Sequence, residues 1–225
     1  FSRMHCQSGR RERQMKQEDL MKALGTCLEE KGKRKFTQSV EFIINFKGVD
    51  FSKQDSRMNL SIALPNGTGK STKVAVFADG QMALDAKNAG ADLVMPASEI
   101  PELAKDKIKL KTLMKDYIFF AQPNLMMQVG KNLGQSMGVR DKLPKPIVGA
   151  SFEKLAEVER RTVKLKSKGK YLPTVSCLVG TETMPPEKIA ENVTQVYEAV
   201  SNAVGKQSLK SAFVKLTMGK PVRVI

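Results

Sequence analysis

The sequence predicts a mixed α/β and α+β fold of two domains, in which a three-layer, Rossmann-like α/β domain is inserted into an α+β domain built from both ends of the chain. The spacing of apolar residues along the chain indicates this arrangement. Near both ends, alternating strand-like runs accompany helices of 3.6-residue period, whereas in the middle short apolar strands alternate with helices. The length of 225 residues, 41% of them hydrophobic, is enough for two small domains with their own cores.

The first part of the chain combines one helix with alternating strands. Residues 1–17 are polar and basic and are expected to form a flexible arm. Apolar residues then recur at helical spacing over 18–30, and the basic run 31–35 is expected to end that helix. SVEFIINF (39–46) alternates as a strand does, and a second strand is expected over 58–64. We expect these two strands to pair antiparallel on one sheet.

The middle of the chain reads as a parallel α/β unit. Strands are expected over 74–78, 92–95 and 117–121, and helices over 79–88, 100–114 and 125–133. The segment 130–149 is rich in Gly and Pro and is expected to be mostly loop.

The last part returns to the α+β pattern. Strands are expected over 162–166, 172–179 and 212–216, and a helix over 186–204 that begins at paired prolines and carries one apolar stripe. The changes of rhythm place residues 1–66 and 151–225 in the discontinuous α+β domain and residues 67–150 in the inserted domain.

The net charge points to an anionic partner. The chain carries 38 Lys and Arg against 23 Asp and Glu, a net charge of +15. Nucleic acid is the first candidate partner and an anionic membrane surface the second, although no apolar stretch of about 18 residues is present to span a bilayer. The inserted domain accounts for +4 and the remainder for +11. The discontinuous domain is therefore the better candidate for binding the anionic partner.

The cysteine and histidine content excludes several kinds of catalytic site. The only histidine, His5, lies in the basic leader, so a Ser-His-Asp or Cys-His arrangement would depend on a mobile end. Cys6, Cys27 and Cys177 are odd in number and far apart, which suggests a reducing compartment and gives no zinc-ligand spacing. We therefore expect no catalytic residue, no metal and no cofactor.

The stretch LPNGTGKST (64–72) resembles a phosphate-binding loop but fails two requirements. A Walker-type loop needs a glycine five residues before its Gly-Lys-Ser, and Leu64 occupies that position, followed by Pro65 without an N–H to donate. Such a loop must also open a helix, whereas 74–77 reads as a strand. We interpret the stretch as a turn or linker between two strands; the alternative is a nucleotide-binding enzyme.

Six segments give the chain a specific resemblance. They are KFTQSVEF (35–42), LPNGTGK (64–70), KVAVFADG (73–80), AGADLV (89–94), GKNLG…LPKP (130–146) and LTMGKPVRV (216–224). In this order they resemble the universal large-subunit ribosomal protein family that builds the mobile L-one stalk, in its archaeal form. The loops around 134–138 and 143–146 depart from the family pattern, which limits what can be carried over to the inserted domain, and residues 1–17 have no clear match.

The resemblance implies a non-enzymatic, cytoplasmic ribosomal protein that is monomeric within the ribosome. Its discontinuous domain would bind a helical junction in large-subunit rRNA and, in many members, a similar fold in the protein's own mRNA, so that it represses its own translation. The stalk would assist the movement and release of deacylated tRNA at the exit site. An assembly factor with the same RNA-binding domain is the alternative within this class.

The resemblance also implies which residues bind RNA and where the domains hinge. Small hydroxyl side chains and bare backbone can approach the shallow minor groove of RNA, apolar side chains can contact sugar or base, and lysines neutralise phosphates. The implied RNA-binding residues are Lys35, Phe36, Ser39, Lys168, Lys215, Thr217, Met218, Gly219 and Lys220, and the implied hinge residues are Gly67, Gly69, Pro146 and Gly149.

Overall fold

The computed structural model describes residues 15–51, 53, 56–147, 152–167 and 172–225. The chain divides into two compact units. We call residues up to Gly69 together with Thr162–Ile225 the discontinuous unit, and Lys70–Arg161 the inserted unit. The mixed α/β fold class expected from the sequence is confirmed.

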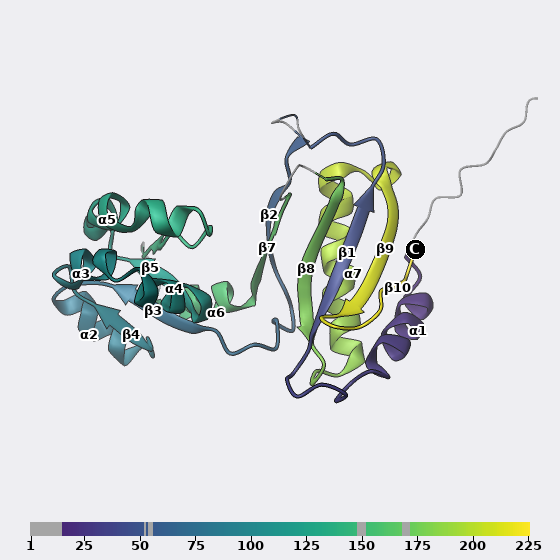
Figure 1. The fold of residues 1–225 in the computed structure, drawn as a ribbon, viewed down its shortest axis with the longest axis horizontal. Helices are drawn as coiled ribbons and strands as arrows, with labels where there is room; N and C mark the ends of the chain where they lie inside the picture. The colour runs from purple at the N-terminus through teal and green to yellow at the C-terminus, as the bar shows by residue number, and fades with distance from the viewer. Residues whose placement is uncertain (1–14, 52, 54–55, 148–151, 168–171) are drawn as a thin grey trace, which may run out of the picture. The chain divides into compact units, whose positions relative to one another are not determined.

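The discontinuous unit is built on an antiparallel four-stranded sheet in the order β10-β9-β1-β8 (Figure 1). Its strands are β1 (Ser39–Phe46), β8 (Thr174–Thr181), β9 (Leu209–Leu216) and β10 (Val222–Arg223). Every second residue of β1 is buried, as the alternation predicts: Val40, Phe42, Ile44 and Phe46. One face of the sheet therefore carries the core.

Two helices complete this core: α1 (Gln17–Leu28) and α7 (Pro186–Val204), which is followed by a short 3-10 turn, η3 (Lys206–Ser208). Leu20 and Leu24 of α1 and the apolar stripe of α7 belong to one buried cluster with the inward side chains of β1. The stripe comprises Ile189, Val193, Val196 and Val200, so the periodicity of this helix predicted its buried face. The basic run 31–35 lies beyond the end of α1.

The second strand of the chain does not join the first, so the expected pairing was wrong. β2 (Asn59–Ala63) pairs antiparallel with β7 (Thr162–Lys166) in a separate two-stranded ribbon. Both edges of β1 are already occupied, by β8 and β9, which leaves no edge to which β2 could hydrogen-bond. Ile62 and Leu165 anchor the ribbon in the core of the discontinuous unit.

The inserted unit is a parallel sheet in the order β4-β3-β5-β6 between helices (Figure 1). Its strands are β3 (Lys73–Phe77), β4 (Leu93–Met95), β5 (Tyr117–Ala121) and β6 (Lys145–Pro146). Its helices are α2 (Gln81–Asn88), α3 (Glu99–Lys105), α4 (Lys107–Asp116), the turn η2 (Pro123–Leu125), α5 (Met126–Gly138) and α6 (Phe152–Arg161).

Two hydrophobic clusters separate the helices into layers. One contains Ala75 and Phe77 of β3 with side chains of α3, α4 and α5. The other contains Val74 and Val76 with side chains of α2 and α6. Because neighbouring residues of a strand point to opposite faces, the helices cover both faces of the sheet. This is the three-layer arrangement expected of a parallel sheet.

Several helix predictions in the inserted unit need correction. The helix expected over 125–133 continues to Gly138. The first nine residues of the expected loop 130–149 are therefore helical, in spite of their glycines. Its buried Val129, Leu133 and Met137 offset the cost of glycine in a helix, about 1 kcal/mol per residue. The helical region 100–114 is divided at Asp106, whose backbone angles (φ −86°, ψ 75°) leave the helix.

Helix α6 was not predicted, and it moves the end of the inserted unit. Phe152 packs edge-on against Phe120 of β5, with ring centroids 5.6 Å apart, and Ala156 is buried in the same cluster. With α6 included, the compact inserted unit ends at Arg161, whereas the sequence placed this boundary at residue 150.

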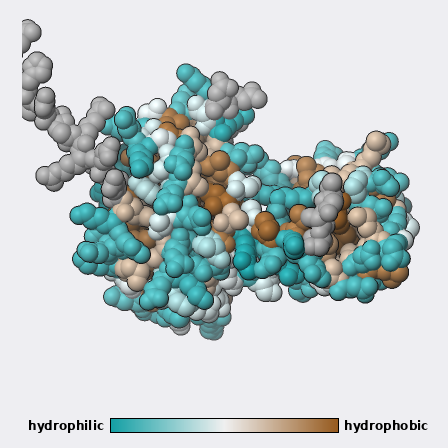
Figure 2. Space-filling view, turned by 180° about the vertical axis from the view of Figure 1, so that it is seen from behind, coloured by the Kyte–Doolittle hydropathy of each residue, from teal (hydrophilic) through white to brown (hydrophobic). Residues whose placement is uncertain are grey.

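Hydrophilic side chains make up most of the face shown in Figure 2, and hydrophobic side chains occur there in smaller groups. None of the helices in the described ranges combines the length and hydropathy needed to cross a membrane.

Candidate RNA-binding site

The antiparallel sheet brings together residues that lie about 180 positions apart in the sequence. Since β1 runs antiparallel to both of its neighbours, its first residues lie beside the last residues of β8 and β9. Ser39 pairs with Thr181 of β8, and Val40 pairs with Leu216 of β9. We call the group at this end of the sheet the strand-end site: Phe36, Ser39, Thr217, Met218 and Gly219.

Thr217 holds two of the chain segments of this site together. Its hydroxyl accepts a hydrogen bond from the backbone N–H of Ser39 (3.1 Å) and donates one to the Ser39 carbonyl (3.2 Å), while its own N–H also donates to that carbonyl (3.0 Å). The hydroxyl therefore joins the turn after β9 to the start of β1. One lone pair remains as an acceptor for an outside donor.

The backbone after Thr217 is fixed by a residue that the sequence analysis did not single out. The N–H of Met218 donates to Oε1 of Gln38 at 3.2 Å, and Gln38 is almost completely buried. The Met218 side chain remains 59% exposed. The backbone of Met218 is therefore held in place, while its flexible apolar side chain is left free to make contacts.

Gly219 occupies a tight turn. Its N–H donates to the Leu216 carbonyl at 3.0 Å. A Cβ at this position would stand 3.0 Å from a carboxylate oxygen of Glu30 and 3.0 Å from Cβ of Leu216. Glycine therefore keeps the turn close to the end of α1, with no side chain above it.

Exposed apolar and basic groups surround the turn. Phe36 is 51% exposed, far more than a core phenylalanine would be, and Lys35 and Lys220 are exposed next to the site. Lys215 lies on the half-exposed face of β9, opposite Glu41 of β1. Lys168 lies outside the described residues. The structure thus gathers eight of the nine predicted RNA-binding residues at or near one end of a sheet.

A buried carboxylate adjoins the site and was missed by the sequence analysis. Glu182 follows β8, and its N–H donates to the Gln38 carbonyl at 3.0 Å. Its side chain is buried, and Oε2 has no hydrogen-bond partner among the described residues. The only sequence signal for either Gln38 or Glu182 is a polar residue at the end of an apolar strand.

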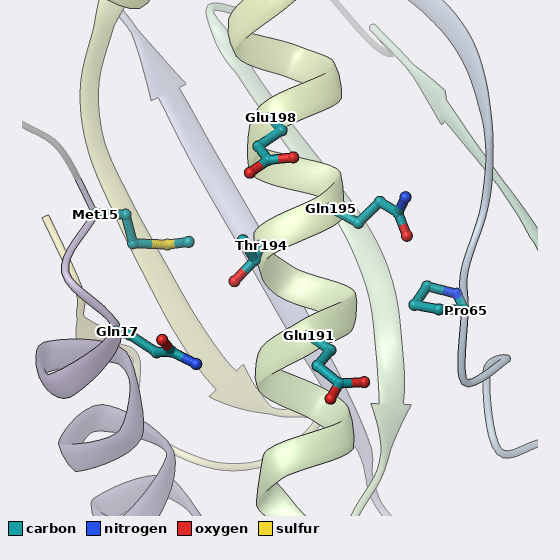
Figure 3. A pocket seen from close by; sticks show the side chains of 7 residues that line it. All are labelled: Met15, Gln17, Pro65, Glu191, Thr194, Gln195 and Glu198. Carbon is teal, nitrogen blue, oxygen red and sulfur yellow. The ribbon is translucent and has the colours of Figure 1, made fainter.

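The structure gives no support to the nucleotide-binding alternative. The segment that contains Gly69 and Lys70 leads into β3, not into a helix, so no helix N-terminus is available for a phosphate. A cavity of about 480 Å³ does lie beside Pro65, but it is lined by Glu191 and Glu198 (Figure 3). These carboxylates would repel a phosphate.

The described thiols are not arranged as nucleophiles or metal ligands. Cys27 and Cys177 are buried and free. Burial raises the pKa of the Cys177 thiol to about 12 and also raises the pKa of the Cys27 thiol above its usual 9.0. Within the described ranges, no group of three or more His, Cys, Asp and Glu side chains could hold a metal ion.

The predicted hinge residues lie in different surroundings. Gly67 and Gly69 are in the discontinuous unit, with backbone φ angles of +66° and +70°. Pro146 is in strand β6 of the inserted sheet, where it pairs with Ala121. Gly149 lies outside the described residues. The hinge assignment remains a prediction.

Comparison with known proteins agrees with the fold and the site motifs. The family model described as the Ribosomal protein L1p/L10e family matches residues 27–220. This chain belongs to that family. The match includes β1, the 64–70 segment and the turn at Thr217–Gly219. Members are structural ribosomal proteins, which confirms the expectation of a non-enzymatic protein.

Relatives within the family support the archaeal type. The Large ribosomal subunit protein uL1 of Methanothermobacter thermautotrophicus is 43% identical over 93% of this chain and 100% of its own length. The proteins of the same name from Thermofilum pendens (43% identical, 85% of this chain and 86% of its own) and Archaeoglobus fulgidus (40% identical, 92% and 97%) are similar. The expected archaeal-type family is confirmed.

Proposed function

We propose that this protein is a structural component of the cytoplasmic large ribosomal subunit and that its strand-end site binds rRNA. The observation that carries this proposal is the convergence of exposed Phe36 and Met218 with the bare turn at Gly219, where hydrogen bonds hold the backbone of Met218 and Gly219. The names of the archaeal relatives and the net charge of +15 agree with it.

The geometry suits the minor groove of an RNA helix, which is wide, shallow and lined by 2′-hydroxyls. Gly219 would allow the backbone to come close to the groove, and the free lone pair of Thr217 would accept a hydrogen bond from a 2′-hydroxyl. Phe36 and Met218 would lie against sugars or an unstacked base. Because Thr217 and Gln38 already fix the backbone, little conformational entropy would be lost on binding.

The lysines around the site would supply affinity without sequence specificity. Lys35, Lys215 and Lys220 would neutralise phosphates and release counterions. Within this proposal the bound RNA is the stalk junction of large-subunit rRNA, and the family resemblance adds deacylated exit-site tRNA and the protein's own mRNA as further partners. The inserted unit would move on a hinge as the stalk moves.

Replacing Lys35 by Gln should weaken binding to a transcript of the stalk junction and reduce its salt dependence. One lost phosphate contact is expected to lower the slope of log K against log salt by about 1 and the affinity about three- to tenfold at moderate salt. Filter binding at several salt concentrations measures both quantities.

Lys109→Gln is the matched control, because Lys109 is an exposed lysine on α4 of the inserted unit. It should leave the affinity and the slope nearly unchanged. Equal effects of the two variants would mean that only the overall charge matters, which would argue against a phosphate contact at the strand-end site.

A further inference from the structure

The segment that leaves the discontinuous unit is folded onto that unit. We call residues 64–69 the exit segment. Pro65 and Asn66 form the middle of a β-turn, closed by the Gly67 N–H that donates to the Leu64 carbonyl at 3.3 Å. Leu64 and Thr68 are buried, with 1% and 8% of their surface exposed. An exposed flexible linker would not bury two of its four side chains.

One fully buried side chain holds this turn. The backbone N–H of Asn66 donates to Oδ1 of Asn192 at 3.2 Å, and Nδ2 of Asn192 donates to the carbonyls of Gly67 (2.9 Å) and Val179 (2.8 Å). Asn192 has no exposed surface and stands on the buried side of α7. Both of its N–H donors and its oxygen are used, so it joins the exit segment, α7 and β8.

A second set of contacts fastens the outer side of the turn. Nδ2 of Asn66 donates to Oε2 of Glu191 (2.6 Å) and to the Lys188 carbonyl (3.3 Å). Figure 3 shows Pro65 next to the α7 side chains Gln195 and Glu191. The turn is therefore held to α7 from the inner side by Asn192 and from the outer side by Asn66.

Gly69 marks the last tightly packed position. A Cβ on Gly69 would stand 2.6 Å from Oγ1 of Thr181 and 2.7 Å from Sδ of Met184, closer than real Cβ contacts. The next two residues, Lys70 and Ser71, are exposed. Gly69 is also exposed, so burial of the chain ends at Thr68, and Gly69 is the last residue of the segment that lies close to other side chains, those of Thr181 and Met184.

We infer that Asn192 locks the exit segment to α7, so that the discontinuous unit stays rigid through Gly69 and the outgoing chain first bends at 70–72. Gly67 and Gly69 then serve a close-packed turn and do not supply the flexibility of a hinge. Thr181, against which Gly69 packs, also pairs with Ser39 of the strand-end site. Thr181 of β8 therefore contacts both the last residue of the exit segment and Ser39 of the strand-end site.

Hydrogen exchange of the full-length protein, measured by mass spectrometry without RNA, tests this inference. In the wild type, the amides of Asn66 and Gly67, which donate to Asn192 and Leu64, should exchange at least about tenfold more slowly than those of 70–72, since exchange requires the turn to open. Equal rates in the two stretches would overturn the inference, whatever the variants show.

Asn192→Asp is the sharper variant because it keeps the acceptor for the Asn66 N–H but removes both donors. It should speed exchange at Asn66 and Gly67 at least about tenfold while the amides of β3 in the inserted unit keep their protection. Asn202→Ala, which changes an exposed asparagine on the same helix, is the control and should leave exchange unchanged.

Unchanged protection of Asn66 and Gly67 in the Asn192→Asp variant would also overturn the inference. Because the experiment contains no RNA, its outcome does not depend on the proposed rRNA binding. Conversely, a loss of RNA affinity with intact protection at Asn66 and Gly67 would concern the strand-end site alone.

Discussion

Replacing Met218 by Asp should lower the affinity for the stalk-junction rRNA about 10- to 100-fold. The substitution removes an apolar contact and places a negative charge where the proposal places RNA, an effect of about 1–3 kcal/mol with 1.4 kcal/mol for each factor of ten. Met218 is 59% exposed and only its backbone N–H is bonded, so the fold should tolerate the change. Filter binding at fixed salt measures the affinity.

Met127→Asp provides the matched control. Met127 is 72% exposed on α5 of the inserted unit, so this variant adds the same charge at a methionine outside the discontinuous unit. It should leave the affinity within about twofold of the wild type, apart from the small effect of one unit of net charge. If Met218→Asp bound as tightly as Met127→Asp, Met218 would not belong to the RNA-binding site.

Replacing Gly69 by Ala should destabilise the discontinuous unit by about 2–4 kcal/mol. The left-handed backbone at φ +70° costs a residue with a Cβ about 1–2 kcal/mol, and the close approach of Thr181 and Met184 adds an overpacking cost of about 1–3 kcal/mol. Denaturant unfolding followed by the reactivity of Cys177, which is buried in this unit, reports its stability.

Gly90→Ala separates the two costs. Gly90 has a similar φ of +80°, but no atom lies within 4 Å of the position that a Cβ would take, so alanine there meets only the backbone cost. The same thiol assay should show the larger loss for Gly69→Ala, while circular dichroism records the smaller loss for Gly90→Ala in the inserted unit. Equal losses would show that the exit segment is not closely packed at Gly69.

The sequence predicted those helices and strands in which buried apolar residues recur at regular spacing. The alternation of β1 and the stripe on α7 gave the buried face of each, because the core contributes most of their stability. Helix α5 was cut short because Gly130 and Gly134 suggested a loop, although its three buried side chains outweigh their propensity. Helix α6 was missed because its sequence FEKLAEVERR is mostly charged and buries only Ala156 completely.

Long-range relations could not be derived from local patterns. Nothing within β2 shows that its partner is β7, about 100 residues further on, and not the nearby β1. For the strand-end site, the family resemblance named most residues, but the bond between Thr217 and Ser39 and the support from Gln38 required the fold. The sequence did offer one indication that Asn192 is buried, namely its position beside the apolar stripe of a helix, but no prediction was made from it.

Crosslinking to purified large-subunit rRNA tests the central claim most directly. The bound protein is irradiated and digested, and the crosslinked peptides and nucleotides are identified. The account predicts that protein crosslinks concentrate in peptides containing Phe36 and Thr217–Lys220, and that the nucleotides fall at one helical junction. Crosslinks confined to the inserted unit, or spread over the basic surface without preference for these peptides, would contradict it.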